Sequence, residues 1–309
     1  MKFLNNKFLK NAGLAVLIAL FFTACDKEDS PAAATENLDA KIAANANLTL
    51  FQAALEKTRL NTFTEGGGPF TIWAPNNAAF NALGVNTAAD LNTIDSNLLV
   101  QILTYHIQVG NRSFVEIPFG PNANMVTQGG FTQYASRKQG GSAYINGAEV
   151  IEADIRATNG YMHVINAVLI PPFLTTAQAL AQSPNYARFY QALVKTGTAT
   201  ATNPLTIFAV PNTVMIAAGY DSTTIANAAS TALTTLTSIM KYHTVNKRIF
   251  APDFVPGPLM TVQGTNVTIS KTGGLTVKGT SNPAPFAITP NNLITTTGVI
   301  HTINGLLKP

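Results

Sequence analysis

A motif that occurs twice constrains the fold of this chain more than any other feature. The first copy, GYMHVINAVLIPP, covers residues 160–172, and the second, GVIHTINGLLKP, covers residues 298–309. A sequence that repeats at a fixed interval builds the same structural unit more than once. We therefore predict two tandem copies of one domain, over residues 36–172 and 173–309, each large enough to bury its own core.

Further blocks extend this alignment through both copies. The matching blocks are TIWA at 71–74 with TIFA at 206–209, PN at 75–76 with PN at 211–212, YH at 105–106 with YH at 242–243, and QG at 128–129 with QG at 263–264. Matching the two PN pairs makes Val210 a one-residue insertion. All four histidines fall at repeated positions, because His106 matches His243 and His163 matches His301. The repeat therefore covers most of the chain.

The N-terminal segment has the layout of a secretory signal. Three lysines precede an apolar run over residues 12–22 that is too short to span a bilayer. The run ends in FTAC, residues 22–25, which resembles the lipobox of bacterial lipoproteins, with Phe22 in place of the usual Leu. We predict a lipoprotein signal peptide over 1–24, lipid attachment at Cys25 and a flexible tether over 25–35. Cys25 is the only cysteine, so no internal disulfide can form.

The sequence of the tether indicates where in the cell the protein is located. The run DKED at residues 26–29 resembles the surface-export signal of lipoproteins in some Gram-negative bacteria. We expect an outer-membrane lipoprotein that is exposed at the cell surface, with the periplasmic face as the alternative. The membrane would then be one partner, through the lipid on Cys25.

Charge is divided unevenly between the two copies. Residues 1–24 hold three lysines and no acid, so their removal lowers the formal charge from +4 to +1. Residues 36–172 carry ten acids and seven bases, net −3, whereas residues 173–309 carry two acids and eight bases, net +6. The second copy could favour an anionic partner such as an acidic glycan or lipid headgroups, although a solvated basic surface accounts for the same charges. The bases are scattered, which argues against nucleic acid as a partner.

Local patterns predict an α+β fold. Apolar spacing indicates helices over residues 48–60, 78–83, 98–106, 186–194 and 233–243. Asn76-Asn77 offers an N-cap for the second of these helices, and Asn146-Gly147 is typical of a hairpin turn. The stretch 160–170 is apolar on both faces, so we expect a buried strand along its whole length. Helices and short strands without steady βαβ alternation are typical of the α+β class.

These blocks together resemble the fasciclin domain, an extracellular adhesion module. The resemblance is carried by PFTIWAPNNAAFNAL (69–83), ILTYH (102–106), VTQGG (126–130) and ADIRATNGYMHVINAVLIPP (153–172), and by LTIFAVPNTVMIAAG (205–219), IMKYH (239–243), MTVQG (260–264) and TTGVIHTINGLLKP (296–309). It implies two domains, each a β-sheet wedge packed with a helical bundle.

Several positions depart from the family pattern. Asn166 and Asn304 stand where the family usually has Asp, and Ile216 stands where the first copy has Phe80. The second copy also has Asn292 where the first has Asp154. The first copy is therefore nearer the family pattern.

The resemblance also names candidate binding residues. In animal members, a Tyr-His motif and a segment near an Asp-Ile pair are implicated in integrin binding. These positions correspond to Tyr105, His106, Asp154 and Ile155 in the first copy and to Tyr242 and His243 in the second. The competing interpretation is that Tyr and His at a helix-to-strand junction are hydrogen-bonded core residues.

Catalytic and metal chemistry find little support in the sequence. No two histidines lie three or four residues apart, and the chain lacks G-x-S-x-G. We expect no catalytic residues, no metal site and no cofactor. The sequence predicts a non-enzymatic adhesion or binding module with a protein or glycan ligand at the cell surface. The alternatives are a carbohydrate-binding or scaffold lipoprotein of an outer-membrane system and, less favoured, a hydrolase.

Overall fold

The computed structural model describes residues 34–200 and 204–309. The predicted signal peptide, Cys25 and nearly all of the tether lie outside the described residues. Residues Ala34–Pro309 form one compact unit that contains both copies of the repeat.

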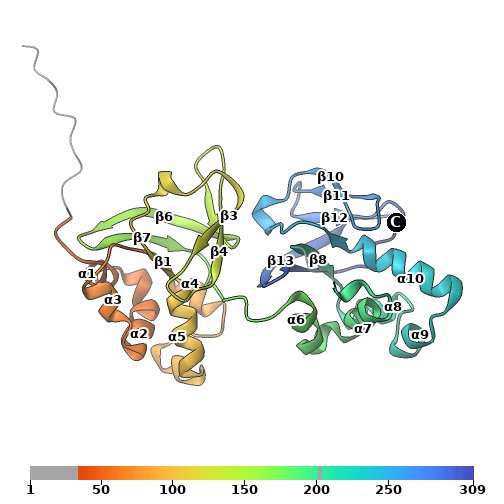
Figure 1. Ribbon diagram of the computed structural model, residues 1–309, viewed down its shortest axis with the longest axis horizontal. Coiled ribbons are helices and arrows are strands. Elements are labelled where there is room, and N and C mark those ends of the chain that lie inside the picture. The colour runs from red at the N-terminus through yellow and green to blue at the C-terminus, as the bar shows by residue number, and fades with distance from the viewer. Residues whose placement is uncertain (1–33, 201–203) are drawn as a thin grey trace, which may run out of the picture. The chain divides into compact units, whose positions relative to one another are not determined.

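The first copy begins with helices and continues into a sheet (Figure 1). Its helices are α1 (Leu38–Ala43), α2 (Thr49–Thr58), α3 (Asn61–Glu65), α4 (Asn77–Asn81) and α5 (Ser96–Tyr105), with 3₁₀ turns η1 (Ala46–Leu48), η2 (Ala88–Thr93) and η3 (Phe114–Glu116). Its strands are β1 (Phe70–Pro75), β2 (Ile107–Val109), β3 (Gly120–Val126), β4 (Thr132–Arg137), β5 (Ala143–Ile145), β6 (Ala148–Ala157) and β7 (Gly160–Ile165).

The second copy has a matching order of elements. Its helices are α6 (Thr176–Gln182), α7 (Ala187–Lys195), α8 (Asn212–Ala217), α9 (Ser222–Asn227) and α10 (Ser230–Tyr242), with 3₁₀ turns η4 (Pro184–Tyr186), η5 (Thr198–Thr200) and η6 (Ala251–Asp253). Its strands are β8 (Leu205–Ala209), β9 (Thr244–Val245), β10 (Gly257–Met260), β11 (Asn266–Ser270), β12 (Thr276–Lys278), β13 (Phe286–Thr295) and β14 (Gly298–Ile303).

The strand orders of the two sheets are the same. The first sheet runs β2-β1-β7-β6-β5-β4-β3, and the second runs β9-β8-β14-β13-β12-β11-β10. In each sheet the last strand of the copy pairs in parallel with the first, β7 with β1 and β14 with β8, and the other pairs are antiparallel. The repeat in the sequence is therefore a repeat of topology, and the predicted α+β class with two tandem domains is confirmed.

The glycine that opens each motif has a steric cause. A Cβ on Gly160 would lie 2.0 Å from the Phe70 carbonyl oxygen, and one on Gly298 would lie 2.2 Å from the Leu205 carbonyl oxygen. Both distances are far below van der Waals contact. Only glycine allows the first and last strands of each domain to pair at this point.

Each sheet buries apolar side chains against its helices. In the first copy Leu38, Phe51, Leu103 and Met162 belong to a core between helices and strands, and helices α1–α5 gather on one side of the strands in Figure 1. A second core, which includes Trp73 and Tyr105, fills the space among the strands. Strand β6 bridges the two parts of the sheet and contains two register shifts. Bulges of this kind bend a strand, which allows one sheet to enclose two cores.

Two local predictions are confirmed at single residues. Asn76 is the N-cap of α4, and its side chain accepts a hydrogen bond from the Ala79 amide. Asn146 and Gly147 both have positive φ, +50° and +84°, and they connect the antiparallel strands β5 and β6. This is the type I′ geometry that makes Asn-Gly a hairpin signal.

The predicted insertion at Val210 is wrong. Asn212 accepts a hydrogen bond from the Arg188 amide and donates to the Pro184 carbonyl. Asn77 makes the same pair of bonds in the first copy. Asn212 is therefore equivalent to Asn77, and Pro211, one residue earlier, takes the N-cap place that Asn76 holds.

The same register change corrects the side-chain equivalence in this helix. The residue that matches the buried Phe80 is Met215, which is fully buried, and not Ile216, which is 52% exposed. The second copy has thus kept an apolar core residue at this position. Tertiary hydrogen bonds, rather than the visible Pro-Asn pairs, set the register.

The predicted strand over residues 160–170 is also too long, because β7 ends at Ile165. Its partner β1 ends opposite that residue, at Pro75. The next residue, Asn166, turns toward the start of β6, where its side chain accepts from the Glu149 amide. Because β1 has ended and β6 extends only two residues beyond its pair with Ile165, the apolar alternation after Ile165 does not continue as a strand.

Candidate functional site

The Tyr-His pair of the first copy is buried and fully engaged within the domain. Tyr105 and His106 both have 0% exposure. The Tyr105 hydroxyl donates to the Thr132 carbonyl at 2.8 Å and accepts from the Asn146 amide group at 2.8 Å. These bonds join helix α5 to strand β4 and to the β5–β6 turn, and burial raises the pKa of Tyr105.

His106 fixes the chain that follows strand β7. Its Nε2 accepts from the Leu169 amide at 2.9 Å, so the proton lies on Nδ1, which donates to the Ile102 carbonyl at 2.7 Å. Both ring nitrogens are therefore occupied by backbone groups. Burial lowers the pKa of His106 to about 4, and the imidazole is neutral at physiological pH.

The pair in the second copy repeats this arrangement. His243 bonds the Ile239 carbonyl at 2.9 Å and the Leu307 amide at 3.0 Å. The Tyr242 hydroxyl donates to the Asn266 carbonyl at 2.7 Å. Tyr242 and His243 both have 0% exposure, and burial lowers the pKa of His243 to about 4. All four residues thus hold their domains together, and none presents an exposed atom to a partner.

The histidines of the closing strands also lie in the interior. His163 stacks on Trp73 with ring centroids 4.8 Å apart, and its Nε2 donates to the Arg112 carbonyl. His301 makes the matching bond to the Ile249 carbonyl, while its Nδ1 has no partner among the described residues. Burial lowers the pKa of both imidazoles, to about 4 for His301.

Asp154 and Ile155 differ from the Tyr-His pairs. Asp154 is exposed and has φ +58°, and its carboxylate accepts from the Phe114 amide at 2.7 Å. Ile155 is half-buried against the helical core of the first copy. Asn292 has φ +40° and accepts from the Ala251 amide at 2.8 Å, as the alignment of Asp154 with Asn292 predicts. Asp154 is therefore the one predicted binding residue with an accessible side chain, and its binding role stays a prediction.

No metal centre or catalytic cluster emerges from these residues. The described parts of the chain contain no group of three His, Cys, Asp or Glu side chains that could hold a metal ion. Each described imidazole is committed to backbone groups by at least one ring nitrogen.

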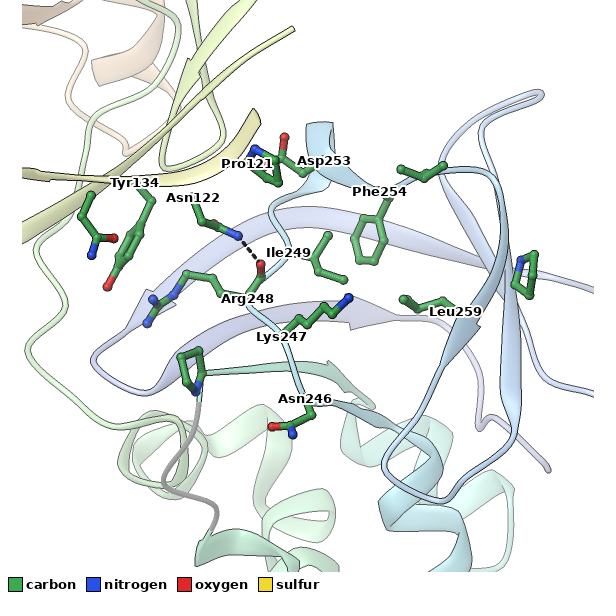
Figure 2. Close-up of a pocket in the computed structure, with 14 residues that line it drawn as sticks. Pro121, Asn122, Tyr134, Asn246, Lys247, Arg248, Ile249, Asp253, Phe254 and Leu259 are labelled. Atoms are coloured by element: carbon green, nitrogen blue, oxygen red, sulfur yellow. Dashed lines mark hydrogen bonds between the residues drawn. The ribbon is translucent and has the colours of Figure 1, made fainter. Parts of the chain in front are cut away.

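A cavity of about 690 Å³ lies where strands β3 and β4 meet the segment that follows β9 (Figure 2). Its lining residues are Pro121, Asn122, Asn124, Tyr134, Pro204, Asn246, Lys247, Arg248, Ile249, Asp253, Phe254, Val255, Pro258 and Leu259. Both polar and apolar groups face it. Such a mixture of groups is typical of sites for small organic ligands.

Arg248 is the central charged residue of this cavity. Its side chain extends toward Tyr134 in Figure 2, with the guanidinium carbon 4.0 Å from the ring centroid. Arg248 is only 7% exposed, and burial lowers its pKa, while Tyr134 acts in the opposite direction. The Asn122 side chain donates to the Arg248 carbonyl at 2.6 Å and so fixes the backbone of this segment.

Asp253 is the acidic residue of the cavity lining. Its carboxylate lies 3.2 Å from the Lys138 ammonium and accepts from the Ser136 hydroxyl at 2.8 Å. Its charge is therefore compensated by residues of strand β4 and the turn after it. No sequence motif marks this cavity. The excess of bases in residues 173–309 was the available signal, and Lys247 and Arg248 contribute two of them.

Comparison with known proteins agrees with this architecture. The Fasciclin domain family matches residues 46–171 and 184–309. Protein sll1483 of Synechocystis is 34% identical over 131 residues, which are 42% of this chain and 71% of that protein. The cell surface glycolipoprotein MPB83 of Mycobacterium bovis is 34% identical over 110 residues, 35% of this chain and 47% of that protein.

A solved structure also aligns with the chain. A FAS1 domain pair from the insect cell adhesion molecule fasciclin I covers 84% of this chain and 96% of its own, with 21% identity and a TM-score of 0.40. The sequence relatives each match about the length of a single domain.

Proposed function

Because the chain belongs to the fasciclin family, with domains that match over residues 46–171 and 184–309, we propose that it is a non-enzymatic adhesion or binding lipoprotein of a bacterial envelope. Cys25 carries the lipid at the start of the tether, residues 25–35, and the two domains stand at the cell surface on the outer membrane. Tandem domains let two weak contacts add through effective concentration.

The proposal rests on a contrast between polar side chains that are buried and bonded within the fold and apolar side chains that are exposed at the surface. The histidines and the Tyr-His hydroxyls are committed to internal bonds, whereas Phe119 is 64% exposed and Val255 is 77% exposed. Both line one shallow depression together with Pro121 and Arg137. Exposed apolar residues that gather in one place are typical of surfaces for protein contact.

An adhesion assay tests this use of the surface. Cells that display the double variant Phe119→Ser and Val255→Ser should lose attachment, with the melting temperature unchanged because both side chains are exposed. Val109→Ser is the matched control, since Val109 is 70% exposed and lies outside the depression. Normal attachment by the double variant, or equal loss in the control, contradicts this role.

The anchor is supported by the residues around Cys25 and by a relative whose name describes a cell surface glycolipoprotein. In the described part of the chain no helix is both long and apolar enough to cross a membrane. Three acyl chains, at about 0.8 kcal/mol per buried CH₂, hold a protein on a bilayer almost permanently.

Fractionation tests the anchor. Cys25→Ser should move the protein from the membrane fraction to the soluble fraction, and membrane retention of this variant would refute lipid attachment. Protease added to intact cells then distinguishes the surface from the periplasmic face. A glycan array and a protein cross-linking experiment on intact cells separate a glycan ligand from a protein ligand.

A further inference from the structure

The cavity beside Arg248 contains polar groups that the protein itself leaves unsatisfied. Arg248 Nε and Asn122 Oδ1 are buried and have no hydrogen-bond partner among the described residues. Both residues line the cavity of about 690 Å³. Buried polar groups are nearly always paired, so an unpaired donor and an unpaired acceptor on two residues that line one cavity point to a ligand that would supply their partners.

The donor side requires an anion. Arg248 is 7% exposed and forms no ion pair with the described residues. Its Nη2 makes two long bonds of 3.3 Å, to the Thr295 and Thr296 carbonyls. A buried charge without a counter-charge is unfavourable, and a guanidinium presents its donors in a fork that matches a carboxylate.

The acceptor side requires a hydroxyl or amine. The Asn122 side chain donates from Nδ2 to the Arg248 carbonyl, which fixes the orientation of the amide. Its Oδ1 is therefore the unpaired atom and can only accept. A plain fatty acid has no donor to offer once it is ionised, whereas a hydroxylated carboxylate has both groups.

The remaining lining suits a ring-shaped anion. Lys247 is exposed and supplies a second cation, and the charge of Asp253 is compensated by Lys138. Phe254 and Leu259 give the cavity apolar walls, against which the C–H faces of a sugar ring can pack.

We propose that this cavity binds a hydroxylated organic carboxylate, specifically a uronic acid residue of an acidic polysaccharide. The inference rests on the proposed binding function and names the ligand class. The Arg248 guanidinium pairs with the carboxylate, and Asn122 Oδ1 accepts from a ring hydroxyl. In this site Lys247 and Arg248, two of the basic residues of the second copy, serve to bind the ligand.

Calorimetric titration of the purified full-length protein tests the inference, using glucuronate, a galacturonate oligomer, glucose and octanoate as probes. Glucuronate and the oligomer should bind. Glucose, which lacks the carboxylate, and octanoate, which lacks the hydroxyl, should not bind. Tighter binding of the oligomer identifies a polymer as the source of the ligand, and equal binding identifies the free sugar acid. Absence of binding by both uronates refutes the proposal.

Variants connect binding to the two unpaired groups. Arg248→Met should weaken glucuronate binding by about ten- to a hundredfold, because a hydrogen bond to a charged group is lost. Arg188→Met removes a half-buried arginine outside the cavity and is the matched control. Asn122→Gly removes the acceptor and tolerates the φ of +61° at this position.

Thermal unfolding separates ligand binding from a structural role. Arg248→Met should unfold at the same temperature as the wild type or higher, because an unpaired buried charge has been removed. A large drop in melting temperature with unchanged glucuronate affinity would show that Arg248 serves only the fold, and would overturn the proposal. Titration in solution needs neither the anchor nor adhesion, so failure of the adhesion assay leaves this result independent.

Discussion

Acidification should destabilise both domains through their buried imidazoles, and His106 offers the clearest test. The ring is fully buried and neutral, with Nδ1 donating to the Ile102 carbonyl and Nε2 accepting from the Leu169 amide. Protonation would place a second hydrogen on the ring, at Nε2, directly against the Leu169 N–H. The imidazole of His106 therefore binds a proton more weakly in the folded state than in the unfolded chain.

The sign and size follow from the two pKa values. Burial lowers the pKa of His106 from 6.5 to about 4, so between these values the unfolded state binds more protons. Stability is fully present above pH 6.5 and is lost as the pH falls toward 4. Between pH 7.5 and 5.0 this one group should cost about 2 kcal/mol of unfolding free energy.

The assay uses the single tryptophan of the chain. Trp73 is fully buried in the first domain, so its fluorescence follows urea unfolding of that domain. His106→Gln should lower stability at pH 7.5 by about 1–3 kcal/mol, since a buried backbone group loses its partner. At pH 5.0 the difference from wild type should shrink by about 2 kcal/mol, because the variant has no imidazole to protonate.

His243→Gln is the matched control, since His243 makes the same pair of bonds in the second domain. His243→Gln should lower the unfolding free energy of the second domain, measured by circular dichroism, and leave the Trp73 fluorescence transition of the first domain unchanged. A folded His106→Gln protein with the same pH dependence as wild type would refute the reasoning. So would a wild-type protein that gains stability on acidification over this range.

Two further changes test the hydrogen bonds and ion pairs described above. Tyr105→Phe leaves the Thr132 carbonyl and the Asn146 amide without a partner, so the unfolding free energy of the first domain should fall by about 1–3 kcal/mol in urea titrations, and an unchanged value would contradict the bonding. Asp253→Asn removes the ion pair with Lys138; a double-mutant cycle with Lys138→Met should give a coupling on the order of 1 kcal/mol that shrinks in 1 M salt, and a coupling insensitive to salt would contradict an electrostatic origin.

Much of the fold was predictable because repetition and local turn chemistry are visible in the chain. The hairpin at Asn146-Gly147 needed only two residues with positive φ, which that pair adopts readily. The family departures at Asn166 and Asn304 proved harmless to the fold. Each side chain uses its oxygen to accept one backbone N–H, a role that Asn and Asp can both fill.

The two wrong predictions, the insertion at Val210 and the strand over residues 160–170, concern places where contacts with residues distant in the sequence determine the local structure. The two Pro-Asn pairs invited an alignment, but Asn212 is placed by its bonds to helix α7 and the turn before it, and these contacts put Met215 in the core. Likewise the alternation after Ile165 reads as strand, although β1 has already ended beside it. Local pattern carries no information about where a neighbouring strand ends.

The candidate binding residues also separate what local sequence shows from what tertiary contacts decide. Tyr105 and His106 stand out in the sequence as a motif. The structure shows that both are buried in the core, with bonds to α5, β4 and the chain after β7. Arg248 and Asn122 carry no motif and lie 126 residues apart, yet one hydrogen bond joins them beside a cavity.

By itself the sequence determined the number of domains, their α+β class and their family. These features follow from repetition and from local patterns of turn and apolar residues, which can be read along the chain. Only the tertiary structure decided which polar groups are consumed by the fold and which remain unpaired. Pairing depends on residues that the chain brings together from far apart, and hydrogen-bond geometry is fixed only after packing.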